Sequence, residues 1–479
     1  MTVTEAAPSV DPPPFTNYAG MVMAAPMVRV SVIAFRLFAA RCGSDVVFSE
    51  ELVAAKLQKC VREARPVPDY MIAKDGDPQP LGSGWDVPVV DALRFPPGTQ
   101  LVEFVRYEPY GKNTTRRAVV FSTVRIPPEY RAKRPWSEGK PFILQMGVSD
   151  PEAGARSAAL VKDDVDGFDV NMGCPKKFSV SNGMGAALMT DVDRAAKILT
   201  SIRAAIGPTK PFSFKTRVFE TVDESVAQLT KLLGTGAVHS VTLHARTRPQ
   251  RSDTKPRVDL AAEVAAKMRA LFPHIAFVFN GSIGCSGMDG AGHVGVVDGK
   301  PWGGRAAILE AVRAMGFDGG LVARDAMWNP TVLLPSAPPG ADPADVARGS
   351  YYCEDYMRVH RRLLEYHAHC GNGMAFLKYH LTRTFGQKQL QTAHPEAYKK
   401  ILAGKCIADF AIALGATTEE AAHWESVHSA AGADTDAAAA DEETSGAVLP
   451  VDVGGRRSRE AAGVAPDAAA ASKPQPAGA

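Results

Sequence analysis

A cysteine lies in a short segment at residues 171–177, which reads Asn-Met-Gly-Cys-Pro-Lys-Lys. A thiol on a short loop, between glycine and proline, can be presented to a bound ligand. As a thiolate it would be a nucleophile, and as a thiol near its usual pKa of about 8.5 it would be a general acid. The alternative is that Cys174 is a buried structural residue, the usual role of a lone cysteine. The segment alone leaves both interpretations open.

Polar residues also stand at the carboxyl ends of most of the short apolar runs in the chain. They are Glu50 or Glu51, Gln145, Asn171, Lys215, His244, Asn280 and Arg324. In a barrel of parallel strands, the carboxyl ends and the loops that follow them carry the chemistry. Any one of these residues could be a polar group satisfied within a core, but a polar residue at nearly every strand end predicts one shared site.

Two of these strand ends have the residues of a phosphate site. Residues 280–282 (Asn-Gly-Ser) and 322–324 (Val-Ala-Arg) place small side chains where backbone N–H groups must approach an anion, and Arg324 can pair with it. Barrels commonly bind phosphate after their seventh and eighth strands, although two ordinary turns would look similar. Lys215 and Gln145 suit a planar polar ring with an anionic edge. Flavin mononucleotide (FMN) has these parts.

Eight apolar runs alternate with helical, alanine-rich segments up to about residue 335. The runs are residues 20–25, 45–48, 142–146, 167–170, 211–215, 238–243, 276–279 and 319–322. Helical periodicity is present between them, as at residues 191–206 and 222–233. Strand–helix alternation indicates parallel pairing, and continuously apolar runs are typical of strands covered on both faces. We therefore predict an α/β fold, a (β/α)8 TIM barrel, in preference to an open doubly wound sheet.

The remaining chain divides around this barrel. The predicted parts are a flexible leader (1–17), the catalytic barrel (18–335), a smaller all-helical domain (345–428) and a disordered tail (429–479). Two insertions interrupt the barrel, near residues 62–139 and 284–304, and the first contains a candidate hairpin at 101–108 and 117–124. Helices are expected at residues 351–368, 373–385 and 394–414. The tail has eight acidic and four basic residues and almost no aromatic ones, a composition that cannot form a core.

Composition excludes several classes of protein. The 479 residues are 46% hydrophobic and 22% charged with a formal net charge of +2, which excludes collagen-like and fully disordered chains. No apolar run approaches the roughly 20 residues of a membrane helix. The first 28 residues contain no Lys or Arg, unlike a signal or transit peptide. Seven scattered cysteines without a CxxC pair favour a reducing compartment, so we expect a cytoplasmic protein, with the nucleus as the alternative.

Two further patterns resemble known sites less well. Residues 290–295 match GxGxxG, but no strand leads into them, so we interpret them as a glycine-rich loop. A second group could suggest zinc: Cys353, His360, His367, His369 and Cys370. It contains no paired-cysteine knuckle, so we predict no metal site and interpret these histidines as solvated or facing nucleic acid.

Eight short motifs, in this order along the chain, resemble those of the tRNA-dihydrouridine synthases. They are Ala-Pro-Met-Val-Arg (25–29), Leu-Gln-Met-Gly (144–147), Asp-Val-Asn-Met-Gly-Cys-Pro-Lys (169–176), Gly-Met-Gly-Ala-Ala-Leu (183–188), Lys-Thr-Arg (215–217), His-Ala-Arg (244–246), Asn-Gly-Ser (280–282) and Ala-Arg-Asp-Ala-Met-Trp-Asn-Pro (323–330). They cover roughly residues 21–334, and the helical segment behind them resembles the family's second domain. The Asn-Met-Gly-Cys-Pro-Lys and Met-Trp-Asn-Pro forms look most like the eukaryotic branch that acts on position 20.

This resemblance implies a role for each matching residue. The cofactor-binding residues would be Pro26, Met27, Gln145, Lys215, His244, Asn280, Gly281, Ser282, Ala323 and Arg324. Cys174 would be the catalytic proton donor. The substrate-binding residues would be Asn171, Arg29, Lys176, Arg217 and Arg246. Ala245 and Ser282 stand where the family usually has glycine, and we expect only a minor backbone adjustment at each.

The implied activity is that of an NAD(P)H- and FMN-dependent oxidoreductase. It would reduce uridine to 5,6-dihydrouridine in the D-loop of tRNA, at position 20, with NADPH or NADH as the reductant. Hydride would reach C6 and Cys174 would protonate C5, a role that requires the protonated thiol. The alternatives are another FMN-dependent barrel reductase of a small molecule, and a tRNA-binding protein that has lost catalysis.

The helical segment supplies the charge that an RNA partner requires. Its basic residues between positions 356 and 400 are Arg358, Arg361, Arg362, Lys378, Arg383, Lys388, Lys399 and Lys400, against only two acidic ones. This asymmetry fits a phosphate-binding face. We expect a monomer that contacts tRNA through the barrel and the helical domain, without a double-stranded-RNA-binding domain.

Overall fold

The computed structural model describes residues 17–73, 93–110, 114–131, 134–251, 253–283, 305–334 and 356–431. Three sequence predictions therefore lie wholly or largely outside the described residues: the leader, the glycine-rich insertion at 284–304 and the tail from residue 432. Residues 429–431, which we assigned to the tail, instead complete and cap a helix. The other boundaries of the four parts stay predictions.

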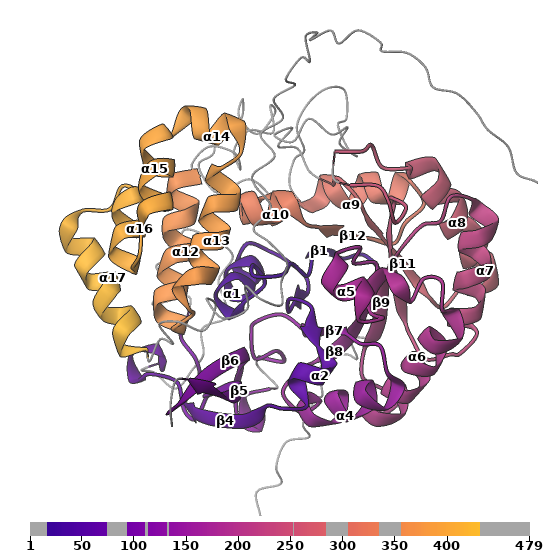
Figure 1. The fold of residues 1–479 in the computed structure, drawn as a ribbon, viewed down its shortest axis with the longest axis horizontal. Coiled ribbons are helices and arrows are strands. Elements are labelled where there is room, and N and C mark those ends of the chain that lie inside the picture. Colours follow the sequence, from indigo (N-terminus) through magenta and orange to yellow (C-terminus); the bar gives the residue numbers. More distant parts are fainter. Residues whose placement is uncertain are drawn as a thin grey trace, which may run out of the picture. The chain divides into compact units, whose positions relative to one another are not determined.

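Eight parallel strands form a nearly closed barrel (Figure 1), which confirms the predicted fold class. They are β1 (Val22–Ala24), β2 (Val47–Phe48), β7 (Phe142–Gly147), β8 (Gly167–Met172), β9 (Phe212–Arg217), β10 (Ser240–His244), β11 (Ala276–Asn280) and β12 (Gly319–Val322). The order is β1-β12-β11-β10-β9-β8-β7-β2, and β3 (Leu52–Val53) also pairs with β7. Between β1 and β2, the Asp45 backbone N–H donates to the Val22 carbonyl at 3.1 Å. Each predicted apolar run overlaps one of these strands.

Helices surround the strands, and side-chain caps define where several of them begin (Figure 1). They are α1 (Ile33–Arg41), α2 (Ala54–Leu57), α4 (Pro151–Val161), α5 (Lys177–Ser181), α6 (Val192–Ile206), α7 (Val222–Leu233), α8 (Val258–Leu271), α9 (Arg305–Ala314) and α10 (Arg324–Trp328). Asp191 caps α6 through the Arg194 N–H, and Thr221 forms a capping box with Glu224 at the start of α7. Gly207, at φ +82°, ends α6.

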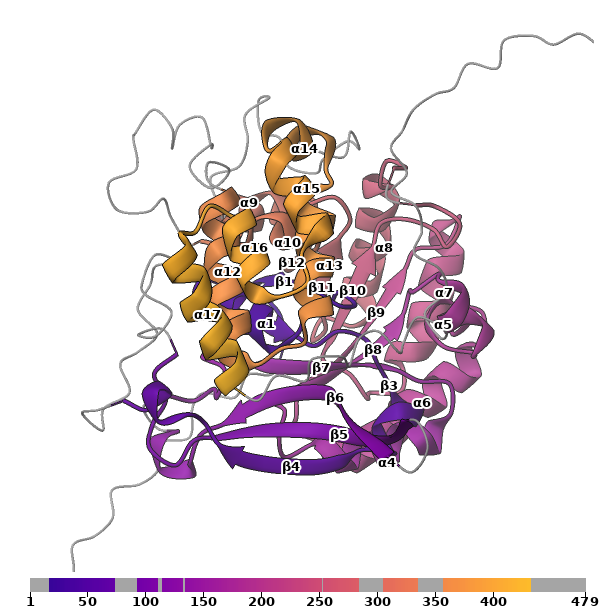
Figure 2. The same ribbon diagram turned by 60° about the vertical axis from the view of Figure 1, so that its left-hand side comes forward.

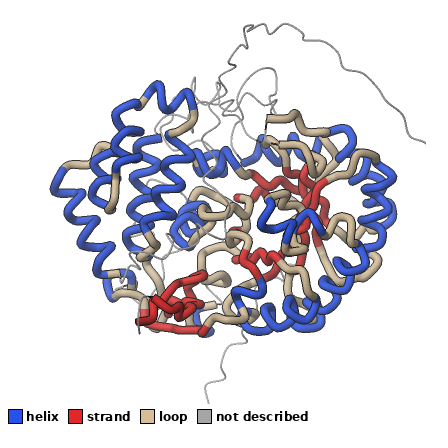
Figure 3. The backbone as a smooth tube through the Cα atoms, in the orientation of Figure 1, coloured by secondary structure: helices blue, strands red, loops and turns tan. Residues whose placement is uncertain are grey.

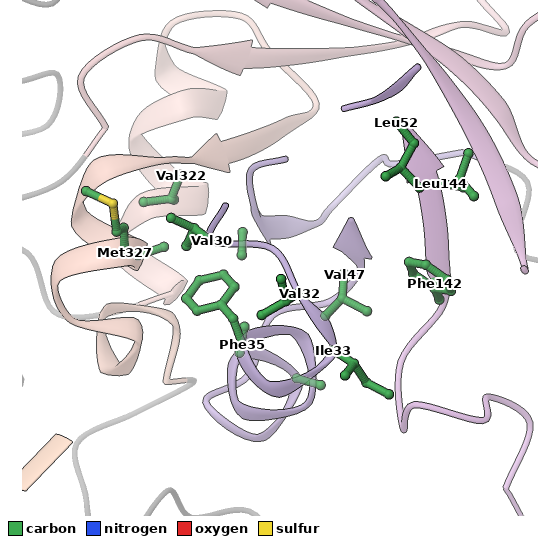
Figure 4. Close-up of a cluster of buried hydrophobic side chains, with 14 of the residues drawn as sticks. Val30, Val32, Ile33, Phe35, Val47, Leu52, Phe142, Leu144, Val322 and Met327 are labelled. Carbon is green, nitrogen blue, oxygen red and sulfur yellow. The ribbon is translucent and has the colours of Figure 1, made fainter. Parts of the chain in front are cut away.

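The alternation of side chains along each strand separates two apolar clusters. Phe142 and Leu144 of β7 face outward and belong to the cluster between strands and helices, which also contains Val47 and Phe35 (Figure 4). Ile143 lies between them in sequence but belongs to the small cluster inside the barrel. Because successive residues of a strand point to opposite faces, Gln145 shares the inner face with Ile143. The barrel interior thus carries polar side chains above its apolar base.

The first insertion folds as a separate antiparallel sheet (Figure 2). Its strands are β4 (Val61–Pro66), β5 (Gln100–Tyr110) and β6 (Thr114–Arg125), and β5 with β6 confirms the predicted hairpin. We did not predict β4, because its exposed, charged sequence has no apolar run. Buried Arg36 of α1 attaches this sheet to the barrel by donating to the Ser122 carbonyl at 2.7 Å and to Glu138 at 2.7 Å.

The segment after residue 355 is all helical in the described residues (Figure 3). Its helices are α12 (Tyr356–Cys370), α13 (Met374–Phe385), α14 (Lys388–Ala393), α15 (Pro395–Ala403), α16 (Ile407–Ala413) and α17 (Thr418–Ala430). The single helix predicted at 394–414 is two helices, because the chain becomes extended at Gly404 and Cys406. Helices α14 and α17 were not predicted. His380 Nε2 bonds the Met327 carbonyl at 2.7 Å and thereby joins α13 to α10.

The histidines that could have suggested zinc are core residues, so our interpretation of them as solvated or facing nucleic acid was wrong. His360, His367, His369 and His380 are all buried. The His360 ring packs edge-on against His380 and Phe385. A polar, histidine-rich sequence resembled a surface, but neutral imidazole rings pack as aromatic groups when neighbouring helices cover them. Among the described residues no three His, Cys, Asp or Glu side chains are placed to hold a metal ion, and Cys353 lies outside those residues.

We predict that acid weakens the fold through these rings. Burial, followed by the charge of His380, holds the pKa of His360 at about 3, and burial holds that of His380 at about 4. The unfolded chain, with a histidine pKa near 6.5, therefore binds more protons than the folded chain below about pH 6.5. The contribution of these rings to the free energy of unfolding is therefore fully present above that pH. Below it the free energy of unfolding falls, by up to ~1.4 kcal/mol per pH unit for each ring.

Urea unfolding between about pH 7 and pH 5 measures this slope. His360→Leu is expected to make it shallower, whereas exposed His423→Gln should leave it unchanged. An identical slope in His360→Leu and the unmodified protein would contradict the prediction.

No helix within the described ranges is both long and apolar enough to cross a lipid bilayer.

Candidate active site at the mouth of the barrel

The loop that carries Cys174 is held by hydrogen bonds from two neighbouring strands. Asn171 Oδ1, near the end of β8, accepts the backbone N–H groups of Gly173 and Cys174, each at 3.0 Å. Arg217 Nε, at the end of β9, donates to the Gly173 carbonyl at 2.8 Å. Asn171 Nδ2 also reaches Gln145 Oε1 at 3.4 Å. These contacts fix the thiol at the mouth of the barrel.

The Cys174 thiol is favoured over the thiolate. Burial first, and then the charge of Glu51, raise the pKa of Cys174, while contacts from Lys176 and Ser179 lower it. A raised pKa keeps the sulfur protonated at neutral pH. This protonation state is the one that a general acid requires and a nucleophile does not.

A polar network lies below this loop, inside the barrel. Gln145 Nε2 donates to Asp169 Oδ2 at 2.8 Å, and Ser213 Oγ donates to Asp169 Oδ1 at 2.6 Å. Burial is the main reason that the pKa of Asp169 rises to about 6. Burial, and then the charge of Arg217, lower the pKa of Lys215 to about 8. We assigned no role to Asp169 from the sequence, although its position two residues before Asn171 on the same strand face was a usable signal.

A cluster of cations lies on the other side of the mouth. Arg246 Nη2 and Arg324 Nη2 both donate to Ser282 Oγ, at 2.6 Å and 3.0 Å. His244 Nε2 lies 3.3 Å from Arg246 Nη1. Burial, and then the charge of Arg324, lower the pKa of Arg246 to about 10. Burial, and then the charge of Lys215, hold the pKa of His244 well below its usual value, and Arg246 and Arg324 add to this effect. Cations that repel one another at a strand end are suited to an anion such as phosphate.

The backbone at this cluster differs from what we expected. Ser282 has φ +52°, in the left-handed region that favours glycine, and Gly281 has φ +137°. A residue other than glycine costs roughly 1–2 kcal/mol there. The adjustment at Ser282 is therefore a strained conformation rather than a minor change, and it places the hydroxyl between the two arginines.

A family model described as Dihydrouridine synthase (Dus) matches residues 103–400, more than half of the chain. The chain belongs to the dihydrouridine synthase family. The tRNA-dihydrouridine(20) synthase [NAD(P)+] of Saccharomyces cerevisiae is 29% identical over 269 residues, covering 56% of this chain and 58% of that protein. The protein of the same name from Schizosaccharomyces pombe is 29% identical over 317 residues, covering 65% and 52%. The chain thus spans somewhat more than half the length of each relative.

The structure brings most predicted residues of this dihydrouridine synthase family member together. The remaining cofactor candidates also lie at strand ends: Pro26 and Met27 follow β1, Asn280 ends β11 and donates to the Leu321 carbonyl at 2.7 Å, and Ala323 follows β12. Met27 packs against the apolar cluster inside the barrel. Their roles in binding remain predictions.

The predicted substrate residues of this family member lie in different surroundings. Lys176 is exposed. The Arg29 guanidinium lies 5.6 Å from the centre of the Tyr379 ring of α13. Arg217 and Arg246 are buried, and Arg217 Nη1 bonds the Thr247 carbonyl at 3.0 Å. In this conformation Arg217 supports the Cys174 loop and Arg246 belongs to the cation cluster.

Proposed function

We propose that this chain reduces uridine to 5,6-dihydrouridine in tRNA, at position 20 of the D-loop, with NADPH or NADH as the reductant. The observation that carries the proposal is a buried Cys174 thiol held on a fixed loop beside a polar network and a cluster of arginines. The names of the yeast relatives supply the position and the nicotinamide. We further propose that it acts as a monomer in the cytoplasm or nucleus.

The strand ends fit FMN in two respects. Arg246 and Arg324 repel each other across Ser282, and a phosphate between them would relieve that repulsion. Gln145 and Lys215 present polar groups inside the mouth, where Met27 adds an apolar contact. When bound and reduced, the flavin would supply the hydride for C6 of the uracil ring.

The side chains of this protein would supply the proton and bind the uracil. Cys174 would give its thiol proton to C5, from the opposite face of the ring. Asn171 Nδ2 carries two hydrogens, of which Gln145 takes one, and the second would bond a uracil carbonyl. The target base must leave its stack in the tRNA to reach this mouth, which costs a few kcal/mol and is easiest in a loop.

The direct test measures dihydrouridine by mass spectrometry. The protein is incubated with NADPH and tRNA that lacks dihydrouridine, and the tRNA is digested to nucleosides. Formation of dihydrouridine at position 20 would support the proposal. NADPH oxidation by the flavin-bound protein without dihydrouridine would favour a reductase of a small molecule, and tRNA binding without flavin would favour a protein that has lost catalysis.

We predict that exposed basic residues of α13–α15 contribute to tRNA binding. Arg383, Lys388, Lys399 and Lys400 are exposed, whereas Arg362 pairs with Glu365 at 2.7 Å. Reversing the charge at Lys388, Lys399 and Lys400 together should weaken tRNA binding by at least about tenfold near physiological salt, because each phosphate contact releases counterions. The triple variant should also show a shallower dependence of affinity on salt.

Filter binding or fluorescence anisotropy at several salt concentrations measures both effects. Lys197→Glu, an exposed change on α6 of the barrel, is the control. An equal loss of affinity in the control and the triple variant would contradict a specific basic face.

A further inference from the structure

We infer that Glu51 returns a proton to Cys174 after each turnover, so that the thiol is replenished from a buried carboxyl group. This inference rests on the proposed role of Cys174 as the proton donor. Neither the motifs nor the comparisons assign a function to Glu51. From the sequence, Glu50 or Glu51 was expected only to stand at the end of the second strand.

The structure separates these two neighbouring acids. Glu50 accepts the Arg29 backbone N–H at 2.8 Å, on the outer side of the loop. Glu51 turns inward, is only 9% exposed, and its charge acts on the Cys174 thiol. Ser179 Oγ reaches Glu51 Oε1 at 3.5 Å and also contacts the thiol. The carboxyl group of Glu51 therefore lies close to the sulfur that the proposed reaction deprotonates.

Two glycines make room for this arrangement. A Cβ atom at Gly147, in β7, would lie 2.6 Å from Glu51 Oε1. A Cβ atom at Gly185 would collide with Ser179 Oγ and would lie 3.0 Å from the Cys174 Cβ. The absence of side chains at both positions lets three polar groups from separate elements meet.

Glu51 is not a satisfied structural acid. Its Oε2 atom is buried and has no hydrogen-bond partner among the described residues. An unsatisfied buried oxygen on an acid is costly, and such groups require an explanation. A carboxyl group that is protonated for part of each cycle provides one, because the neutral acid has a smaller desolvation cost than the carboxylate.

The direction of proton transfer follows from the two environments. Burial raises the pKa of Glu51 to about 7, although contacts from Cys174, Lys176 and Ser179 oppose the rise. Burial and the charge of Glu51 raise the pKa of Cys174 above its usual value. Other charged groups that act on one member of this pair are Glu50, Lys176, Lys215 and Arg217. A proton thus moves downhill from the carboxylic acid to the thiolate.

The step balances without any change of oxidation state. After Cys174 has given its proton to carbon, the thiolate takes the proton of the Glu51 carboxylic acid. The S–H bond forms, the O–H bond breaks, and the carboxylate then takes a proton from water. Glu51 never touches the substrate and is a positioning and relay residue rather than a catalytic one.

The first test follows the thiol without any cofactor or tRNA. The rate of Cys174 alkylation by iodoacetamide is measured against pH on the whole protein, with the labelled peptide quantified by mass spectrometry. The unmodified protein should show two inflections, one near pH 7 from Glu51 and one at higher pH from the thiol. Glu51→Gln should lose the lower inflection and react about three- to tenfold faster near pH 8, because the like charge is gone.

The matched control is Asp166→Asn. Asp166 is another buried acid with a pKa raised to about 6, but it precedes β8 and accepts the Phe142 N–H at 2.9 Å, at the amino end of the strands. This variant should reproduce the alkylation profile of the unmodified protein. If Glu51→Gln also reproduces it, the inference is overturned whether or not the protein forms dihydrouridine.

The second test separates the first turnover from later ones. When the bound flavin of the Glu51→Gln protein has been reduced beforehand, the first dihydrouridine should form at nearly the normal rate, because Cys174 starts protonated. Later turnovers with excess tRNA and NADPH should slow by at least about tenfold. Equal losses of rate in the first and later turnovers would overturn the inference that Glu51 returns a proton. Glu51 would then only influence the pKa of the thiol.

Gly147→Ala provides a second variant in case Glu51→Gln does not fold. Its new Cβ would displace the carboxyl group but keep the acid, so later turnovers should again be the ones that slow. Unchanged later turnovers in a folded Gly147→Ala protein would count against the inference. Absence of dihydrouridine from the unmodified protein, with the alkylation profile as expected, would instead refute only the proposed function.

Discussion

Cys174→Ala is expected to lower dihydrouridine formation by about 10²- to 10⁴-fold, the range that a general acid contributes. Burial and the charge of Glu51 raise the pKa of the thiol, and Asn171 Oδ1 accepts two backbone N–H groups and so fixes the loop. Alanine removes the proton donor but none of those backbone contacts. The measurement is the rate of dihydrouridine formation on tRNA that lacks it, with flavin content recorded for each preparation.

Cys60→Ala is the control for this experiment, because Cys60 is another half-buried free cysteine, directly before β4 of the antiparallel sheet. It should retain normal activity. A Cys174→Ala protein that keeps its flavin and works within about fivefold of normal would contradict the assignment of the proton donor. Loss of flavin in that variant alone would mean that the cysteine contributes to cofactor binding.

Arg324→Gln is expected to weaken FMN binding by about 10- to 100-fold, because a charge-assisted contact to phosphate contributes roughly 1.5–3 kcal/mol. Arg324 shares Ser282 Oγ with Arg246, and its removal also relieves their mutual repulsion. Riboflavin, which lacks the phosphate, should bind the variant and the unmodified protein equally well. Titration of both flavins by fluorescence quenching measures the ratio of the two affinities.

Arg269→Gln is the matched control, since Arg269 pairs with Asp318 at 2.9 Å near the opposite ends of β11 and β12. Its preference for FMN over riboflavin should be unchanged. Equal loss of FMN and riboflavin binding in Arg324→Gln would show that Arg324 supports the fold of the mouth rather than the phosphate.

The elements of the barrel could be predicted because their signals are local. A strand covered on both faces must be apolar along its whole length, as in residues 276–280, and an amphipathic helix must repeat its apolar residues, as in residues 222–233. Strand β4 escaped prediction because it is an exposed edge strand whose partner supplies the pairing. The break near residue 404 escaped because nothing in the sequence there excludes a continuous helix.

Some features of the site could likewise be predicted from the sequence, and others could not. Parallel strands bring their carboxyl ends together, so the positions of Asn171, Lys215 and His244 on one mouth followed from the sequence alone. Which of two adjacent acids meets Cys174 did not, because a rotation of the loop by one residue exchanges Glu50 and Glu51. The burial of Arg246 and of His360 could not be predicted from the sequence either, because it depends on elements that are distant along the chain.

The order of strands and helices in the barrel, the motifs at the strand ends and the family could all be read from the amino-acid sequence. Which of those polar groups are desolvated, and which charges act on each other, depended on the folded arrangement. Periodicity and residue type are signals that extend over a few positions of the sequence. The desolvation of a group depends on every element that packs around it. The raised pKa of Glu51 and the mutual repulsion of Arg246 and Arg324 are properties of that packing.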